Sequence, residues 1–353
     1  MATQPDHLLR PTPDGLYCGA GRFHVDPVRP VERAVITHGH SDHARAGHGA
    51  VLATKETLAI MALRYGADFA VTQQSIAYGE SLIVDDVTVS LRPAGHVLGS
   101  AQAVIGNAAE KIVVSGDYKR RRDPTCAPFE PVPCDVFISE ATFGLPVFHH
   151  PPDSHEIDKL LYSLKMFPER CHLVGAYALG KAQRVIALLR EAGYDAPIYL
   201  HGAMQKMCDL YIAHGVALGE LRATADVLKT PASRESFKGA IVLAPPSALN
   251  DVWSRRLGEL VTCFASGWMR VRARARQRLV ELPLIISDHA DWDELTATVR
   301  EIQPGELWVT HGAEEALVHW SNTIGVPATA LNLVGYDDEN EGEPPATIAD
   351  PAP

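Results

Sequence analysis

The sequence is poor in the features that define secreted, membrane-spanning and cysteine-zinc proteins. Its six cysteines are scattered, without a Cys-x-x-Cys pair, which argues against a disulfide framework and against a structural zinc built on cysteine. No apolar run approaches the ~20 residues that cross a bilayer. Residues 1–6 lack the basic start and apolar core of a signal peptide. These absences predict a reduced, cytoplasmic protein.

Positive charge is also scarce, because 43 acidic residues oppose 32 lysines and arginines and leave a formal net charge of −11. Such a balance is not typical of a nucleic-acid-binding protein. The acidic excess is uneven, however. The Pro-rich segment 337–353 contains six carboxylates and no basic residue, and a tail of that composition is expected to be disordered. The body of the chain is therefore closer to neutrality than the total suggests.

The most informative stretch is residues 37–43, Thr-His-Gly-His-Ser-Asp-His. It follows an apolar run at 34–36 that predicts a buried strand. His38 and His40 are two residues apart and face the same way in an extended chain. Asp42 and His43 are expected to begin a helix and to face a second point. Because imidazole and carboxylate groups bind zinc and its borderline neighbours, the spacing predicts two metal sites in one cluster.

The same pattern recurs along the chain, since several short strand-like runs end in an acid or an imidazole. The residues at these positions are His96, Asp117, Glu140, His289 and His311. Active sites of sheet-and-helix proteins lie at the carboxyl ends of strands. Together with residues 37–43, these side chains are numerous enough for two metals and their helpers.

These motifs resemble those of the metallo-β-lactamase superfamily. Residues 37–43 are similar to its signature, His96 to its third-motif histidine, and Asp117 in Ser-Gly-Asp to its bridging aspartate. Ser-Glu-Ala-Thr-Phe-Gly, Ser-Asp-His and Thr-His-Gly resemble motifs A, B and C of the β-CASP nucleases, with Glu140, His289 and His311 in the motif positions. Phrases such as Gly-Leu-Tyr-Cys, Ser-Gly-Trp-Met and Ser-Asp-His-Ala-Asp-Trp are most similar to the bacterial DNA-ligase-associated exonuclease group.

The resemblance implies an α/β fold in which an αββα metallo-β-lactamase sandwich is interrupted by an inserted α/β β-CASP domain. The expected sandwich comprises residues 1–144 and 283–336, the insertion residues 145–282, and the acidic tail residues 337–353. Alternating strand and helix patterns after residue 171 independently predict a parallel sheet in the insertion.

The resemblance also implies two divalent metal ions, zinc or manganese. The first is expected on His38, His40, His96 and Asp117. The second is expected on Asp42, His43, Asp117 and His311. In this family a hydroxide that bridges the metals attacks phosphorus. The implied catalytic residues are Asp42, Glu140 and His289, and His289 would pair with Glu140 and protonate the leaving oxygen.

Arginines alternate with other residues along 270–278, Arg-Val-Arg-Ala-Arg-Ala-Arg-Gln-Arg. On a strand they would line one face and suit a phosphate backbone, although a solvated edge or loop is the alternative. Lys181 follows Gly180 at an expected helix start, where it would hold a phosphate. The expected substrate-binding residues are Lys181, Ser266, Arg270, Arg272, Arg274 and Arg276.

Three further features have both a binding and a structural interpretation. Residues 119–122, Lys-Arg-Arg-Arg, form a second basic patch near the expected metals or an ordinary solvated loop. Tyr177 and Trp268 would stack on bases or pack in the core. The histidines of the Pro-rich connector are expected at the surface; they are His149, His150 and His155.

The function implied is hydrolysis of DNA by a single-strand-preferring exonuclease of DNA repair. The expected partners are a DNA ligase and a repair helicase, and no membrane association is expected. A ribonuclease of the same architecture is the alternative, because a histidine at motif C is typical of RNA-cutting β-CASP enzymes. The same metal cluster also serves thioester, lactone and β-lactam hydrolases, but the insertion and the arginine row argue against them. Non-catalytic β-CASP subunits have usually lost metal ligands, whereas this chain has every expected one.

Overall fold

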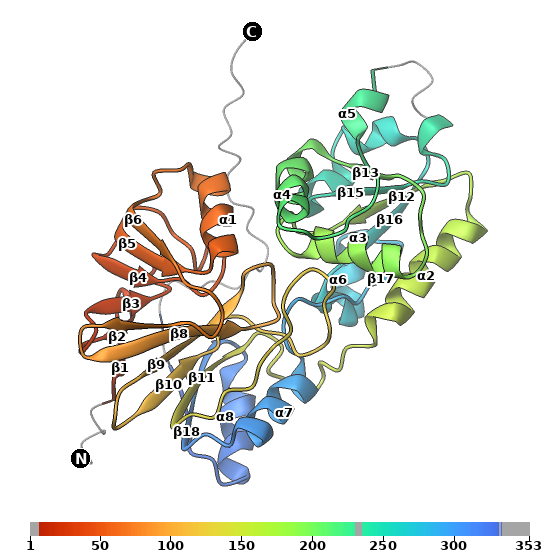
Figure 1. The fold of residues 1–353 in the computed structure, drawn as a ribbon. Helices are drawn as coiled ribbons and strands as arrows, with labels where there is room; N and C mark the ends of the chain where they lie inside the picture. Colours follow the sequence, from red (N-terminus) through yellow and green to blue (C-terminus); the bar gives the residue numbers. More distant parts are fainter. Residues whose placement is uncertain (1–6, 230–234, 332, 334–353) are drawn as a thin grey trace.

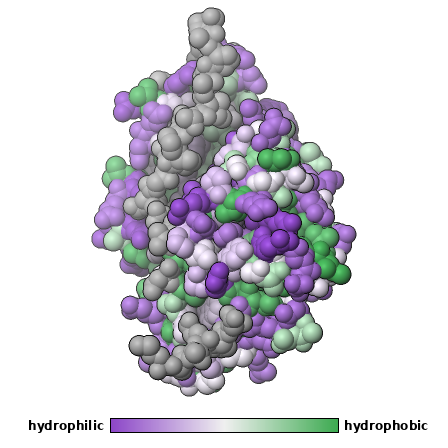
Figure 2. Space-filling model, turned by 90° about the vertical axis from the view of Figure 1, so that its left-hand side faces the viewer, coloured by the Kyte–Doolittle hydropathy of each residue, from purple (hydrophilic) through white to green (hydrophobic). Residues whose placement is uncertain are grey.

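The computed structural model describes residues 7–229, 235–331 and 333, so the tail at 337–353 lies outside the described residues. The described chain forms three sheets with helices on their faces. Two sheets pack together in one half of the molecule, and the third lies in the other half (Figure 1). On the face in Figure 2, hydrophilic residues cover much of the visible surface and hydrophobic residues occur in separate groups. None of the helices in these ranges combines the length and the apolarity that a membrane crossing would require.

The strands of the first half form two facing sheets. The order is β1-β2-β3-β4-β5-β6 in the first sheet and β19-β18-β11-β10-β9-β8-β7 in the second. The first sheet comprises β1 (Leu9–Thr12), β2 (Gly15–Cys18), β3 (Phe23–Val25), β4 (Arg33–Val35), β5 (His48–Ala53) and β6 (Ala70–Ser75). The second comprises β7 (Ser81–Val84), β8 (Val87–Pro93), β9 (Ala101–Gly106), β10 (Lys111–Val114), β11 (Val136–Ala141), β18 (Glu306–Gly312) and β19 (Ala328–Ala330).

Apolar side chains between these two sheets make the core of the first half, with Leu16 and Val89 among them. Helix α1 (Lys55–Tyr65) packs on the outer face of the first sheet. Helices α7 (Trp292–Ile302) and α8 (Glu314–Thr323) cover the outer face of the second sheet (Figure 1). The layers therefore run helix, sheet, sheet, helix, which confirms the predicted αββα sandwich.

The second half is built on an entirely parallel sheet, as the alternating strand and helix patterns predicted. Its strand order is β14-β13-β15-β12-β16-β17. The strands are β12 (Cys171–Gly175), β13 (Ile198–Leu200), β14 (Leu221–Ala223), β15 (Ile241–Ala244), β16 (Leu260–Ala265) and β17 (Leu282–Leu284). The helices are α2 (Asp153–Met166), α3 (Lys181–Glu191), α4 (Gly202–Ala213), α5 (Thr224–Val227) and α6 (Arg272–Gln277), with short 3₁₀ turns η1 (Glu235–Phe237), η2 (Pro246–Asn250), η3 (Ser254–Leu257) and η4 (Gly267–Arg270).

The division into domains at 144/145 and 282/283 stays a prediction. The third sheet continues past residue 282, because β17 pairs with β16 through Leu284. The chain then crosses back to the first half and enters α7.

Two local predictions are wrong. The expected helix start at 43–46 is a single turn, in which the amides of His43 and Ala44 both donate to the carbonyl of His40. The arginine row at 270–278 is not a strand but the end of η4 followed by α6. Alanine and arginine are among the strongest helix formers, and this local preference outweighs the alternation of the arginines.

Candidate metal centre

Most of the predicted metal ligands follow the ends of strands in the first half of the molecule, and their side chains lie close together. Residues 37–43 follow β4, and Asp117 follows β10 through a tight turn. Gly116 has φ +55° in that turn, and a Cβ there would lie 2.6 Å from the Thr37 hydroxyl oxygen. The turn therefore needs glycine in order to bring Asp117 against the histidine loop.

The first predicted ligand set is assembled in the structure. One donor atom from each of its four residues lies within 4.8 Å of all the others, and the residues are His38, His40, His96 and Asp117. The His96 Nε2 atom is 2.9 Å from His40 Nδ1 and 3.7 Å from Asp117 Oδ2. The His38 Nε2 atom is 3.3 Å from Asp117 Oδ2. All four side chains are buried.

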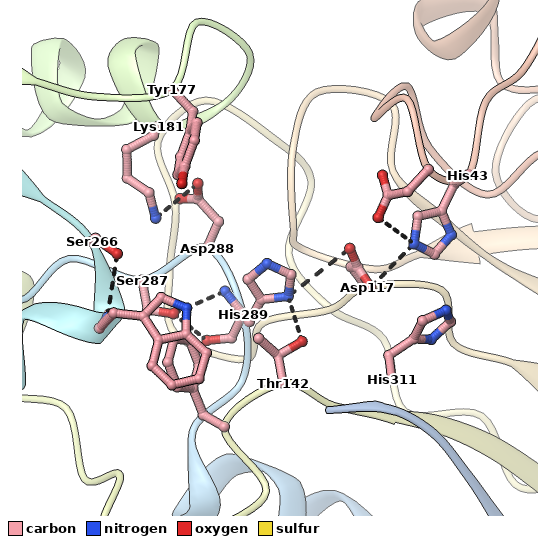
Figure 3. A pocket seen from close by; sticks show the side chains of 14 residues that line it. His43, Asp117, Thr142, Tyr177, Lys181, Ser266, Ser287, Asp288, His289 and His311 are labelled. Atoms are coloured by element: carbon pink, nitrogen blue, oxygen red, sulfur yellow. Dashed lines mark hydrogen bonds and ion pairs between the residues drawn. The ribbon is translucent and has the colours of Figure 1, made fainter. Parts of the chain in front are cut away.

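The second predicted set lies on the other side of Asp117. The His43 Nε2 atom is 3.5 Å from Asp117 Oδ1 and 3.6 Å from Asp42 Oδ2. The ring of His311, which comes from the end of β18, lies 5.3 Å from the ring of His43. Figure 3 shows Asp117 pointing between His289 and His43, with His311 beside them. One carboxylate oxygen of Asp117 therefore lies near the first predicted set and the other near the second.

Asp26 contacts the predicted ligand His43, although the motifs did not point to it. The His43 Nδ1–H group donates to Asp26 Oδ2 at 2.8 Å, and the Thr37 amide and hydroxyl donate to the same carboxylate at 2.8 and 2.6 Å. Such a carboxylate fixes the tautomer and orientation of a ligating histidine. Asp26 directly follows β3, so the rule of an acid after a short strand would have found it.

Burial and neighbouring charges shift the pKa values of several of these groups. Burial lowers the pKa of His38 and of His311 to about 4 each, which leaves both imidazoles neutral at pH 7. Burial would raise the pKa of Asp117, but His43, His289 and His38 lower it well below its usual range. Neutral imidazole and ionised carboxylate are the forms that bind metals.

The donor set fits divalent metal ions. Nitrogen and carboxylate donors suit zinc and its borderline neighbours. Among the described residues, the buried atoms His38 Nε2 and Asp42 Oδ1 have no hydrogen-bond partner. Buried polar atoms are normally satisfied, and a cation in each of the two predicted sets would satisfy one of these atoms.

Glu140 and His289 form a pair beside the cluster, although 149 residues separate them. The His289 Nδ1 atom lies 2.9 Å from Glu140 Oε2 and 4.0 Å from Asp117 Oδ2. The main-chain amide of Tyr118 donates to Glu140 Oε1 at 2.7 Å and holds that carboxylate in place. Burial lowers the pKa of His289, but Glu140 and Asp117 raise it to about 10. A protonated imidazole next to the cluster is suited to proton donation.

A pocket opens at the cluster, between the two halves of the molecule. The first half contributes metal-set residues such as Asp42 and Asp117. The second half contributes Tyr177, Lys181 and other residues of the opposite wall. A ligand in this pocket would touch the metal set and the third-sheet half together.

The predicted substrate-binding residues fall into two groups. Lys181 and Ser266 line the pocket, and so does Trp268. The arginines of the row are absent from the lining residues of that pocket. Arg274 stacks on Trp268, with its guanidinium carbon 4.0 Å from the ring centroid, and the other predicted row members are exposed: Arg270, Arg272 and Arg276.

The prediction that residues 119–122 form a free basic patch is wrong, because the side chain of each residue is paired with a carboxylate. Lys119 is buried and donates to Asp123 at 2.6 Å. The three arginines pair with carboxylates of α7, of its N-cap and of α3. The pairs neutralise the patch and join separate elements.

The surface prediction for the connector histidines holds for two of the three. His149 and His155 are exposed. His150 is half-buried, with its ring 4.6 Å from that of Phe143, and burial lowers its pKa to about 3. Aromatic packing at the pocket wall therefore overrides the polar character of this segment.

Comparison with known proteins gives several relatives. A protein of Opitutus terrae described as a probable DNA ligase is 27% identical over 338 residues, which are 93% of this chain and 31% of that protein. An uncharacterised protein in the lig 3′ region of Acidianus ambivalens is 31% identical over 150 residues, which are 40% of this chain and 99% of the relative. Endoribonuclease ysh1 of Aspergillus fumigatus is 29% identical over 224 residues, 53% of this chain and 26% of that protein. This chain therefore spans less than a third of the first and third of these relatives.

A solved structure, a protein of unknown function from Enterococcus faecalis, superposes with a TM-score of 0.54 at 13% identity, and covers 85% of this chain and 78% of its own. That likeness supports the fold alone. No family model matches the chain.

The chain belongs to the β-CASP family of the metallo-β-lactamase superfamily. This follows from the αββα sandwich, from the predicted ligands in residues 37–43 and from these relatives. Within that family it matches the DNA-ligase-associated group.

Proposed function

We propose that this protein is a metal-dependent phosphodiesterase that hydrolyses DNA, as a single-strand-preferring exonuclease in DNA repair. One observation carries the proposal. Four of the seven predicted metal ligands and His289 line one pocket together with residues of the third-sheet half, and the other three ligands and Glu140 lie next to that lining. The six free cysteines support a reducing, cytoplasmic location.

Two divalent ions, zinc or manganese, would supply an activated water and neutralise the charge of the scissile phosphate. The chain's own groups then orient the reaction. Asp26 holds His43 in the orientation in which its Nε2 faces Asp42 and Asp117. Glu140 orients His289, which donates a proton to the leaving oxygen of the cleaved ester.

The pocket walls suggest how a strand is held. Lys181 and Ser266 lie on the wall opposite the metal set, where they would contact phosphates near the scissile bond. Trp268 and Tyr177 line the same pocket and offer rings on which bases stack. The exposed arginines of the 270–276 segment would bind the backbone farther from the cut.

The relatives support DNA as the substrate. The Opitutus terrae protein, described as a probable DNA ligase, matches 93% of this chain, and the Acidianus ambivalens relative comes from the lig 3′ region. We therefore also propose a functional association with a DNA ligase and, through repair, with a helicase.

Nucleic-acid strands of matched sequence test which substrate the protein cleaves. Single-stranded DNA, duplex DNA and RNA of one sequence, labelled at either end, are incubated with the apoprotein reloaded with Zn²⁺ or Mn²⁺. We expect stepwise shortening of single-stranded DNA and its loss in the variants His40→Ala and Asp117→Ala. Undiminished cleavage in either variant would contradict the catalytic role of the cluster.

A ribonuclease is the second candidate, because the relative from Aspergillus fumigatus is described as an endoribonuclease and His311 stands at motif C. Cleavage of the RNA strand alone would replace the DNA proposal by this one. Both candidates use the same metal centre.

A further inference from the structure

Helix α3 of the third-sheet half holds a loop of the metal centre. Lys181 donates to the carbonyl of Ile286 at 3.0 Å and pairs with Asp288 Oδ2 at 2.9 Å. Arg184, one turn further along α3, donates to the carbonyl of Ser287 and to Asp288 Oδ1. Two cations of one helix therefore contact three successive residues of the loop that precedes His289.

The side chains that make these contacts are almost completely buried. The exposed fractions are 4% for Lys181, 0% for Arg184 and 5% for Asp288. Arg184 also pairs with Asp153 and with Asp123, whose carboxylate accepts from Lys119. A buried charge is costly unless it is paired and hydrogen-bonded, so the Asp288 carboxylate is tied to one position by both cations.

The main chain of the same residue contacts a metal ligand. The His96 Nδ1–H group donates to the Asp288 carbonyl at 2.8 Å, which leaves Nε2 directed at His40 and Asp117. The next residue, His289, pairs with Glu140. A displacement of the 286–288 loop would therefore disturb both a metal ligand and the proton donor.

We propose that Asp288 is a positioning residue through which the third-sheet half completes the metal centre: Lys181 and Arg184 fix its carboxylate, and its carbonyl orients His96. The proposal deepens the proposed function and rests on its metal centre, but it is independent of the nucleic acid that is cleaved. It gives Lys181 a structural duty in addition to the phosphate contact suggested by its place in the pocket.

Metal binding without nucleic acid separates these two duties of Lys181. Apoprotein variants are titrated with Mn²⁺ and followed by electron paramagnetic resonance, and circular dichroism checks that each is folded. We expect Lys181→Gln and Asp288→Asn to raise the dissociation constant of Mn²⁺ about 10–100-fold, the usual effect of losing a group that orients a ligand. Lys181→Arg keeps the charge and should restore most of the affinity.

An ion pair elsewhere between the same two parts of the molecule provides the control. Arg122 pairs with Glu191 at the end of α3 at 2.6 Å, and both side chains are exposed. Arg122→Gln should leave Mn²⁺ affinity unchanged. The double variant Lys181→Gln/Asp288→Asn removes the pair without stranding one of its charges, and its Mn²⁺ affinity should fall as far as that of either single variant.

Wild-type Mn²⁺ affinity in a folded Lys181→Gln variant would overturn the proposal. If a single variant does not fold, wild-type Mn²⁺ affinity in the double variant would overturn it instead. A rise in KM without any change in Mn²⁺ affinity would make Lys181 a substrate contact only and would overturn it as well. A wild-type protein that binds Mn²⁺ but cleaves neither DNA nor RNA would refute the proposed function while leaving this test intact.

Discussion

At the scale of single residues, the candidate metal centre contains groups that hold the predicted ligands as well as the ligands themselves. Asp26 illustrates this, because its carboxylate accepts three hydrogen bonds and one of them fixes His43. Replacement by alanine leaves the ring of His43 free to turn away from Asp117. The prediction follows that Asp26→Ala lowers metal affinity about 10–100-fold, measured by Mn²⁺ titration of the apoprotein.

A matched change distinguishes orientation from general damage to the sandwich. Asp85 pairs with Arg22 and Arg33 on the surface of the same half, so Asp85→Asn should bind Mn²⁺ as the wild type does. Equal losses of affinity in the two variants would show that the effect of Asp26 is not specific to His43.

The proposed role of His289 as proton donor can be tested by changing the leaving group of the substrate. His289→Gln should slow cleavage of DNA by about 10²–10⁴-fold, the usual contribution of a positioned acid. A p-nitrophenyl ester of thymidine 5′-monophosphate has a leaving group that departs without a proton. Its hydrolysis by His289→Gln should therefore remain close to the wild-type rate, measured by the absorbance of the released p-nitrophenolate. The Glu140→Gln variant should behave similarly, because Glu140 orients the imidazole.

Proportional losses of activity on the two substrates would contradict this role. They would show instead that His289 supports the cluster itself, from which it is separated by 4.0 Å at Asp117 Oδ2.

At the scale of elements, α6 divides the arginine row in two. Arg274 faces inward and stacks on Trp268, and Arg278 lies over the ring of Phe264. Arg272 and Arg276 are one helical turn apart and exposed, as is Arg270 in η4. Helical spacing brings residues four apart to one face, so only the outward-facing subset remains available to a passing phosphate backbone.

The outward-facing arginines should determine how binding depends on salt. The triple variant Arg270→Gln/Arg272→Gln/Arg276→Gln is expected to bind single-stranded DNA more weakly. The slope of log K against log salt should fall by about 0.7 for each phosphate that the variant no longer neutralises, measured by fluorescence anisotropy in EDTA. The triple variant Arg22→Gln/Arg29→Gln/Arg33→Gln removes three arginines from the other half and should keep the wild-type slope. An unchanged slope in the first variant would exclude α6 from the binding surface.

The same elements explain what could be predicted from the sequence. An acid or imidazole after a short apolar run is a local signal, so His38, His96 and Asp117 were found from their own neighbourhoods. Alternation of arginine with alanine is ambiguous, because strand periodicity and helix propensity both accommodate it, and propensity prevailed in α6.

Contacts between distant segments carry no local signal. The pairing of Glu140 with His289 spans 149 residues and was expected only from the family resemblance. The hydrogen bonds and ion pairs between α3 and residues 286–288 have no signal in the sequence, because Lys181 has the same sequence context whether it faces a phosphate or a carboxylate. Burial decides between these two environments, and burial is a property of the assembled fold.

At the scale of the whole molecule, buried ion pairs join the two halves, and acid should weaken that junction. Burial would raise the pKa of Asp123, but Lys119 and Arg184 lower it below its usual value. A carboxyl group with a lowered pKa in the folded state contributes stability that is fully present above its unfolded pKa, about 3.9. That contribution is lost as the pH falls through the lower folded value.

Asp123→Asn removes this charge and leaves Lys119 and Arg184 buried with one carboxylate fewer. At pH 7 the variant should be less stable by about 3–5 kcal/mol, the usual cost of breaking a buried pair, measured by urea unfolding. Below about pH 4 the difference from the wild type should shrink, because the carboxyl group of the unfolded wild-type chain then binds a proton that folding must release. Glu191→Gln breaks the exposed pair with Arg122 and should cost little at either pH. The contrary result is a difference in free energy of unfolding between Asp123→Asn and the wild type that stays constant as the pH falls well below the unfolded pKa. That result would show that the junction does not depend on the charge of Asp123.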